Sequence, residues 1–239
     1  MLPPNDECPP EPTPAALAAL IDHTLLKPQA TSDDVRRVCD EALQHRFCSV
    51  CVNPVFAAEV SALLAGSGVK TCVVAGFPLG AHRAELKAEE ARRAIGDGAR
   101  EIDMVLFVGG LKAGRDELVL ADLRGVTEVC RAGGALSKVI LETCLLTDDE
   151  KRRACALCVE AGADFVKTST GFSTGGATVA DVALMSQAVR AHGLGVKASG
   201  GLRTLANALA MLRAGATRIG ASASVAMVRE AELRGPGAE

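Results

Sequence analysis

The sequence contains neither tryptophan nor tyrosine, and its aromatic content of 3% comes from phenylalanine alone. The core must therefore be built from alanine, valine, leucine and isoleucine, which suit helices packed against buried parallel strands. Apolar runs of the roughly 18 residues that span a bilayer are also lacking. Because the N-terminus has no basic start followed by an apolar stretch, we expect no secretory signal, no membrane association and a cytoplasmic location.

An excess of charge of one sign is lacking as well. The net charge is −3, and acidic and basic residues are mixed along the chain without a basic stripe that carries aromatic residues. We therefore expect no nucleic-acid partner. The nine cysteines are an odd number and lie mostly inside apolar segments. Cys39, Cys72, Cys130 and Cys144 are predicted to be small core residues of a protein from a reducing compartment.

Two C-x-x-C pairs, Cys48/Cys51 and Cys155/Cys158, leave a metal or redox protein as one alternative. A zinc site would need all four sulfur atoms to come together. The first pair lies in an expected strand, where positions three apart face opposite sides. The second pair lies on the inner face of an expected helix. We therefore expect neither a metal site nor a cofactor.

Between its two ends the chain alternates short apolar runs with longer amphipathic stretches. Residues 1–14 hold six of the ten prolines and are predicted to form a disordered tail, and residues 233–239 a flexible C-terminus. The predicted strands are Leu20–Leu25, Ser49–Val52, Lys70–Ala75, Glu101–Phe107, Lys138–Glu142, Phe165–Thr168, Gly195–Ala198 and Arg218–Gly220.

Eight uninterrupted strand–helix alternations predict an α/β fold in which residues 15–232 form one TIM (β/α)8 barrel. Single barrels commonly need about 250 residues, close to the length of this chain. A doubly wound open sheet is the alternative. The barrel is favoured because eight strands with short connections close naturally and leave no domain boundary to place.

Polar residues stand at the ends of several strands that should be buried, and barrel enzymes carry their functional groups at the C-terminal strand ends. Lys167 follows Asp-Phe-Val, Lys197 lies in the next strand, and Asp103 lies inside Glu-Ile-Asp-Met-Val. Lys167 alone could be a lysine that reaches solvent at a strand end. A second inward lysine on the neighbouring strand favours catalysis, because burial and a like charge both promote loss of a proton, and a neutral amine attacks carbonyl groups.

Glycine-rich segments follow the last three strands. Barrels often bind phosphate after strands seven and eight, through backbone amides and a helix N-terminus. These glycines could instead serve only tight turns, but their position beside both lysines favours a phosphorylated substrate. The candidate phosphate ligands are Thr170, Gly171, Gly200, Gly201, Arg203, Gly220 and Ser222.

Seven segments, in order along residues 20–225, resemble the deoxyribose-phosphate aldolase family. They are IDHTLLKP (21–28), VCVNP (50–54), VAGFPLG (74–80), EIDMV (101–105), KVILET (138–143), ADFVKTSTGF (163–172) and VKASGGLR (196–203). The resemblance implies a metal-free class I aldolase. Such an enzyme reversibly cleaves 2-deoxy-D-ribose 5-phosphate to D-glyceraldehyde 3-phosphate and acetaldehyde in the catabolism of deoxyribose phosphates.

The resemblance also assigns roles to residues. Lys167 matches the Schiff-base lysine of the family, and Lys197 with Asp103 matches its proton-relay pair. Asp22 and Cys51 match residues that line the pocket. Gly171, Gly200, Gly201, Gly220 and Ser222 match its phosphate-binding loops.

The chain departs from the family pattern at two points. Ala223 stands where many members have a serine, and the chain has no tyrosine, so a C-terminal tyrosine cannot assist proton transfer. Two further alternatives are a Schiff-base barrel enzyme for another sugar phosphate and a non-catalytic barrel that serves as a scaffold. A homodimer is an expectation that rests on no particular residue.

Overall fold

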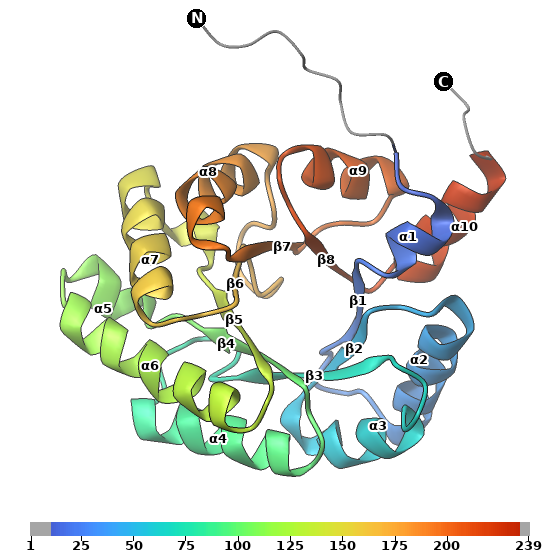
Figure 1. Cartoon of the computed structure of the whole chain (residues 1–239), viewed down its shortest axis with the longest axis horizontal. Helices are drawn as coiled ribbons and strands as arrows, with labels where there is room; N and C mark the ends of the chain where they lie inside the picture. The colour runs from blue at the N-terminus through green and yellow to red at the C-terminus, as the bar shows by residue number, and fades with distance from the viewer. Residues whose placement is uncertain (1–10, 235–239) are drawn as a thin grey trace, which may run out of the picture.

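The computed structural model describes residues 11–234, and in it eight parallel strands close into a barrel in the order in which they occur along the chain. The strands form the centre of Figure 1, and helices surround them. The predicted TIM barrel is therefore confirmed, and the open sheet is excluded. The strands are β1 (Ile21–Leu25), β2 (Ser49–Val52), β3 (Lys70–Ala75), β4 (Glu101–Val105), β5 (Leu136–Ile140), β6 (Phe165–Lys167), β7 (Gly195–Ser199) and β8 (Arg218–Ala221).

Helices follow every strand and cover the outside of the barrel (Figure 1). The α-helices are α1 (Pro14–Ala18), α2 (Ser32–His45), α3 (Ala57–Leu63), α4 (Ala84–Gly96), α5 (Val108–Lys112), α6 (Asp116–Ala132), α7 (Asp148–Glu160), α8 (Val179–Val189), α9 (Leu205–Arg213) and α10 (Ser224–Arg234). Short 3-10 helices are η1 (Pro54–Phe56), η2 (Thr143–Leu145) and η3 (Arg190–His192). Within the described residues, no helix is long and apolar enough to cross a membrane.

Side chains at the helix starts fix two of these helices. Thr31 before α2 and Thr147 before α7 each accept a hydrogen bond from the third helical residue, whose carboxylate accepts one from the threonine backbone in return. This reciprocal arrangement satisfies two of the backbone N–H groups that a helix start leaves without partners. The segment Thr147-Asp-Asp-Glu150 has the Thr-x-x-Glu spacing that this arrangement needs.

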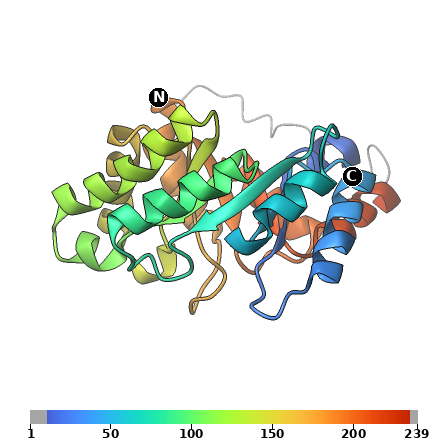
Figure 2. The ribbon, with the colours of Figure 1, turned by 90° about the horizontal axis from the view of Figure 1, so that it is seen from below.

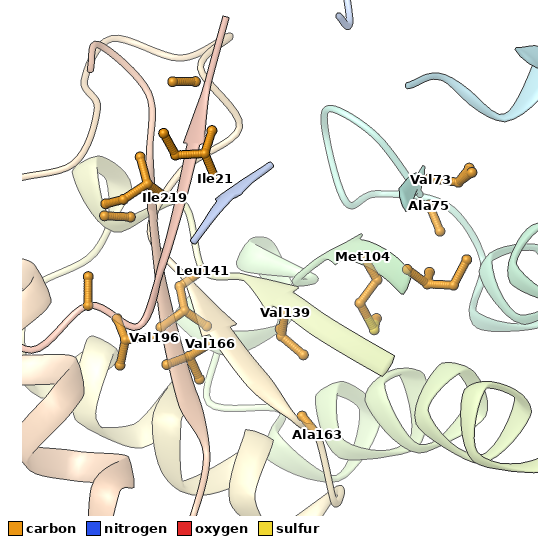
Figure 3. Packing of buried hydrophobic residues seen from close by; sticks show 14 of the residues in the cluster. Ile21, Val73, Ala75, Met104, Val139, Leu141, Ala163, Val166, Val196 and Ile219 are labelled. Carbon is orange, nitrogen blue, oxygen red and sulfur yellow. The ribbon is translucent and has the colours of Figure 1, made fainter. Parts of the chain in front are cut away.

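The apolar core lies between the strands and the helices, outside the barrel wall. Figure 3 shows part of this layer, including Val166 from β6, Val196 from β7 and Ile219 from β8. Because successive side chains of a strand point to opposite sides, the residues next to these point into the barrel. In β6 this alternation sends Val166 outward and Lys167 inward.

The ends of the barrel domain differ from the prediction. Pro14 begins α1, and the Thr13 side chain accepts a hydrogen bond from Ala16 N at 3.2 Å. A proline fits the first helical position because the N–H that it lacks has no partner there. At the other end α10 continues to Arg234, so residues 233 and 234 are helical. The rest of both predicted tails, residues 1–10 and 235–239, lies outside the described residues.

The cysteines largely follow the prediction, with one exception. Cys39, Cys72 and Cys130 are buried, but Cys144 is exposed in the segment that follows β5, so its assignment to the core was wrong. Cys144 lies in the 3-10 helix η2, where it and the next residue, Leu145, are exposed. Among the described residues, no group of close potential metal ligands combines the two C-x-x-C pairs.

Gly195 at the start of β7 makes room for the ring of Phe165 on β6. A methyl group at position 195 would overlap three carbon atoms of that ring. We expect Gly195→Ala to lower the free energy of unfolding by about 1–3 kcal/mol, because overfilling a packed interior displaces its side chains. Urea unfolding measures the change. Gly125→Ala in α6 is the matched control, since the nearest side-chain atom would be 3.8 Å away. Equal losses in the two variants would contradict this role of Gly195.

Candidate active site

Lys167 and Lys197 stand side by side inside the barrel. They are paired in the register of β6 and β7, and their Nζ atoms both donate to Oδ2 of Asp103 on β4, each at 2.7 Å. Lys167 is 2% exposed, and Lys197 and Asp103 are completely enclosed. The structure therefore brings the three predicted catalytic residues together. Their chemical roles stay predictions at this point.

The charge on Lys197 is paired, which corrects one step of the sequence argument. Its Nζ also donates to Oδ2 of Asp22 on β1. Burial by itself lowers the pKa of Lys197, but the carboxylates of Asp103 and Asp22 outweigh this effect and raise the pKa above its usual range. Lys197 therefore keeps its proton and does not act on Lys167 as an unpaired like charge. As an ammonium group, Lys197 has no free electron pair with which to attack a carbonyl group.

A third lysine, Lys138 on β5, was missed as a site residue. Its Nζ donates to Oδ1 of Asp103 at 2.7 Å and lies 2.6 Å from Glu101 Oε2. The predicted strand began at Lys138. The strand instead begins at Leu136, so Lys138 is an interior residue and is completely enclosed. Its place opposite Asp103 in the register of β4 and β5 is the signal that could have identified it.

Arg218 on β8 and Glu101 on β4 were also missed. Arg218 Nη1 donates to Oδ1 of Asp22 at 2.7 Å and to both carboxylate oxygens of Glu101, at 3.0 and 3.1 Å. Its guanidinium group lies over the ring of Phe165, 5.3 Å from the centroid. Both residues begin their strands, where sequence reasoning expects a solvated charge. In a barrel these positions face each other across the interior.

A cavity of about 480 Å³ opens at the C-terminal ends of the strands, and Lys167 lies in its wall. In Figure 2 the loop after β6, in orange, and the loop after β1, in blue, project from this side of the barrel. All the predicted phosphate ligands line the cavity, namely Thr170, Gly171, Gly200, Gly201, Arg203, Gly220 and Ser222. The loops predicted to bind phosphate and the candidate nucleophile thus share one cavity.

Two predicted pocket residues do not line this cavity. Asp22 and Cys51 are completely enclosed. Asp22 holds Lys197 and Arg218, as described above. Cys51 on β2 belongs to a small apolar cluster with Leu26, Cys72 and Val74. We had expected both side chains at the wall of the cavity. They are instead enclosed in the barrel interior, beneath the residues that line the cavity.

The glycines of the cavity wall have conformations that other residues rarely adopt. Gly171, Gly200 and Gly201 have φ values of 83°, 89° and 78°. An added methyl group on Gly200 would lie 3.1 Å from the Cα atom of Gly176, so the loops after β6 and β7 meet closely here. Consecutive backbone amides in such turns form concave sites for anions. Helix α10 also begins two residues after Ser222, and its N-terminus favours negative charge.

Glu142 holds the loop after β6 in place. Its backbone is left-handed, with φ 56°, and its side chain is buried. The carboxylate accepts hydrogen bonds from the backbone N–H of Thr170, at 3.2 Å, and from the Thr170 hydroxyl. Thr170 Oγ1 in turn accepts from Phe172 N at 3.0 Å. This chain of hydrogen bonds fixes the position of Gly171, which lies between the two residues.

Two sulfur atoms lie near the catalytic cluster, and with Asp103 they come close enough to surround a metal ion. Cys72 Sγ donates to Asp103 Oδ1 at 3.2 Å, and Cys72 hydrogen-bonds Cys51 and lowers the pKa of that thiol. Burial raises the pKa of Cys72 itself. Because lysine ammonium groups already contact both oxygens of Asp103, a cation would have to displace them. The expected absence of a metal stays a prediction.

Fold and site together define a barrel enzyme in which a buried lysine faces a cavity with anion-binding loops. The model of the DeoC/LacD family of aldolases matches residues 16–229. The chain therefore belongs to this family and is an aldolase.

Individual relatives agree with this assignment. The chain is 57% identical over 212 residues to a deoxyribose-phosphate aldolase from a Geobacillus species, a match that covers 89% of this chain and 94% of the relative. A putative deoxyribose-phosphate aldolase from Coccidioides immitis has a similar structure, with a TM-score of 0.90, 40% identity and coverage of 96% and 92%. A tetrameric deoxyribose phosphate aldolase from Aeropyrum pernix gives 0.87, 37% identity and 92% coverage of both chains.

Proposed function

We propose that this chain reversibly cleaves 2-deoxy-D-ribose 5-phosphate to D-glyceraldehyde 3-phosphate and acetaldehyde, through a Schiff base on Lys167. The observation that carries the proposal is the position of one amine. Of the interior lysines in the described chain, Lys167 reaches the cavity, whereas Lys138 and Lys197 are enclosed beneath it. The names of the relatives supply the substrate, and the cavity loops suit its phosphate.

The first half of the reaction attaches the substrate. Lys167 attacks the C1 aldehyde of the open-chain sugar as a neutral amine, and loss of water from the carbinolamine gives an iminium ion. Lys197 and Lys167 both donate hydrogen bonds to Oδ2 of Asp103. Lys197 is therefore close enough to Lys167 to protonate the hydroxyl group that leaves. Asp103, bonded to both amines, passes protons between them and the substrate.

The second half breaks the carbon–carbon bond. Removal of the proton from the C3 hydroxyl lets the C2–C3 electron pair move towards the iminium nitrogen. D-Glyceraldehyde 3-phosphate leaves, and an enamine remains on Lys167. Protonation of the enamine at C2 and hydrolysis of the resulting iminium then release acetaldehyde and free the amine. Asp103 and Lys197 supply the proton transfers, with water as carrier where the substrate is out of their reach.

The phosphate group holds the sugar in its open-chain form with C1 at Lys167. The loops after β6, β7 and β8 contribute Gly171, Gly200, Gly201 and Ser222, and Arg203 adds a positive charge. When the sugar is held at both ends, its C1 aldehyde and the Lys167 amine are already oriented for reaction. This orientation raises the rate without any additional chemical step. Ala223 contributes no hydroxyl to this site.

A reductive trap tests the proposal. Incubation with acetaldehyde and sodium borohydride, followed by peptide mapping, should place a two-carbon adduct on Lys167, and an assay for D-glyceraldehyde 3-phosphate should register cleavage of the sugar phosphate. A folded protein that gives no adduct would point to a non-catalytic barrel. An adduct without cleavage of this substrate would point to an aldolase for a different sugar phosphate.

Assembly, location and pathway belong to the same proposal. We expect a homodimer in solution, and light scattering behind a sizing column measures the mass directly. The Aeropyrum pernix relative is described as tetrameric, so a tetramer is the outcome that would replace the dimer. A cytoplasmic location and a role in deoxyribonucleotide catabolism agree with the proposed substrate.

A further inference from the structure

Six buried charged side chains inside the barrel form a closed ring of ion pairs, which we call the charge ring. The ring alternates in sign and uses residues from five strands. In order its members are Lys138, Asp103, Lys197, Asp22, Arg218 and Glu101. All six are at most 8% exposed.

Lys138, Glu101 and Arg218 form the part of the charge ring that lies away from the cavity, and their contacts close the ring. Lys138 Nζ lies 2.6 Å from Glu101 Oε2, and Arg218 Nη1 lies 3.0 Å from the same oxygen. Arg218 then reaches Oδ1 of Asp22 at 2.7 Å. None of these contacts involves Lys167 or the residues that line the cavity. The proposed reaction has so far given no role to Lys138, Glu101 or Arg218.

The two oxygens of Asp103 have different partners. Oδ1 accepts from Lys138 at 2.7 Å, and Oδ2 accepts from both Lys197 and Lys167 at 2.7 Å. A carboxylate held at Oδ1 by a fixed ammonium group cannot rotate freely. Lys138 therefore keeps Oδ2 turned towards the two amines of the proposed mechanism.

The charges of the ring balance. Its three cations, Lys138, Lys197 and Arg218, match its three carboxylates, Asp22, Glu101 and Asp103. Lys167 is a fourth basic group that contacts the ring through Asp103 alone. As an ammonium it would leave one positive charge uncompensated in a buried site, where an unpaired charge is costly. As a neutral amine it leaves the interior neutral.

We infer that Lys138, Glu101 and Arg218 are positioning residues that complete a neutral ring, and that this neutrality selects Lys167 as the amine that gives up its proton. The inference rests on the proposed Schiff-base function and explains which of three buried lysines performs it. Lys138 and Lys197 keep their protons because Lys138 has three carboxylates as partners, including Asp22 at 3.7 Å, and Lys197 has two.

Buried charged and titratable side chains lie on all the other strands of the barrel. They are Asp22 on β1, Cys51 on β2, Cys72 on β3, Glu101 and Asp103 on β4, Lys138 on β5, Lys197 on β7 and Arg218 on β8.

The pKa values of Asp103 and Lys138 agree with an ion pair in the free enzyme. Burial by itself would raise the pKa of Asp103, but Lys138, followed by Lys167 and Lys197, holds it well below its usual range. Burial would lower the pKa of Lys138, but Asp103 and its other neighbours raise it well above the usual range. In the free enzyme, Asp103 therefore carries a negative charge and Lys138 a positive charge at neutral pH.

Three variants test the inference through the pH dependence of kcat/KM, whose acidic limb reports the protonation of groups in the free enzyme. Lys138→Met removes a ring cation and leaves the interior more negative, which favours the protonated form of Lys167. We expect the acidic limb to move to higher pH by about one unit or more. At the original midpoint, kcat/KM then falls roughly tenfold and recovers as the pH is raised.

Removal of a ring carboxylate should shift the acidic limb in the opposite direction. Glu101→Gln removes a ring carboxylate and leaves the interior more positive, so the acidic limb should move to lower pH. The double variant Lys138→Met/Glu101→Gln restores neutrality, and its limb should return to the wild-type position. A merely structural role of these residues predicts no such compensation. If Lys138→Met does not fold, Glu101→Gln and the double variant still decide the question.

Lys87→Met is the matched control. Lys87 is as deeply buried as Lys138 and pairs with Asp122 at 2.6 Å, but it lies on α4, outside the barrel. It should leave the acidic limb unchanged. The inference would be overturned if the acidic limb of kcat/KM had the same midpoint in the wild type, Lys138→Met and Glu101→Gln. The borohydride trap on the wild type separates this result from failure of the proposed function, because in that case the wild type would form no adduct on Lys167.

Discussion

Replacement of Lys167 by methionine is expected to lower kcat for cleavage of 2-deoxy-D-ribose 5-phosphate by at least about 10⁴-fold, because the variant lacks the amine that forms the covalent intermediate. Methionine nearly matches the length of lysine and has no amine. The charge ring is balanced without Lys167, so the variant should fold and keep the wild-type midpoint of thermal unfolding or exceed it. The coupled assay for D-glyceraldehyde 3-phosphate and a thermal melt measure the two quantities.

Lys167→Arg separates the amine from its charge. A guanidinium group stays protonated in proteins, so this variant keeps a positive charge but has no neutral nitrogen with which to attack. It should be as inactive as Lys167→Met, and less stable, because it places a permanent surplus cation beside a neutral ring. Appreciable activity in either variant, or a borohydride adduct on Lys197 instead, would refute the assignment of the nucleophile.

Much of the fold follows from local sequence signals. The predicted strands 49–52 and 70–75 agree with β2 and β3 at both ends, because each apolar run is flanked by residues that interrupt a strand. Strand β5 begins and ends two residues before the predicted strand 138–142. Helices α1 and α5 were missed. Each is a single short turn or little more, too short to show helical periodicity.

The convergence of Lys167, Lys197 and Asp103 could be predicted because the ends of parallel strands meet at one face of a barrel. The charge ring could not. Its closure depends on Arg218 of β8 meeting Glu101 of β4 across the barrel, and these residues are not neighbours in the sheet. Such a contact follows from the tilt and stagger of all eight strands, which no local segment of sequence encodes.

The sequence argument misjudged Lys197 because it did not take the carboxylate partners of this lysine into account. Two neighbouring lysines suggested mutual repulsion as the source of a neutral amine. In the structure Lys197 is held between Asp22 and Asp103, and its positive charge is part of a balanced set. The same conclusion about Lys167 then rests on a different cause, namely that its own charge has no match among the interior carboxylates.

Lys197→Met is expected to lower kcat by about 10²–10⁴-fold, the usual contribution of a positioned proton donor. The variant also removes a ring cation, so its acidic limb should move to higher pH, as in Lys138→Met. Lys167 keeps its amine, and borohydride should still trap the two-carbon adduct on it once the pH is raised.

The comparison with Lys138→Met separates the two lysines. Raising the pH restores a neutral Lys167 in both variants, but only Lys138→Met retains the proton donor. We therefore expect kcat of Lys138→Met to approach the wild-type value at high pH, and kcat of Lys197→Met to stay low across the whole range. A Lys197→Met enzyme that recovers fully at high pH would show that Lys197 acts through its charge alone, as a further member of the ring and not as a donor to the substrate.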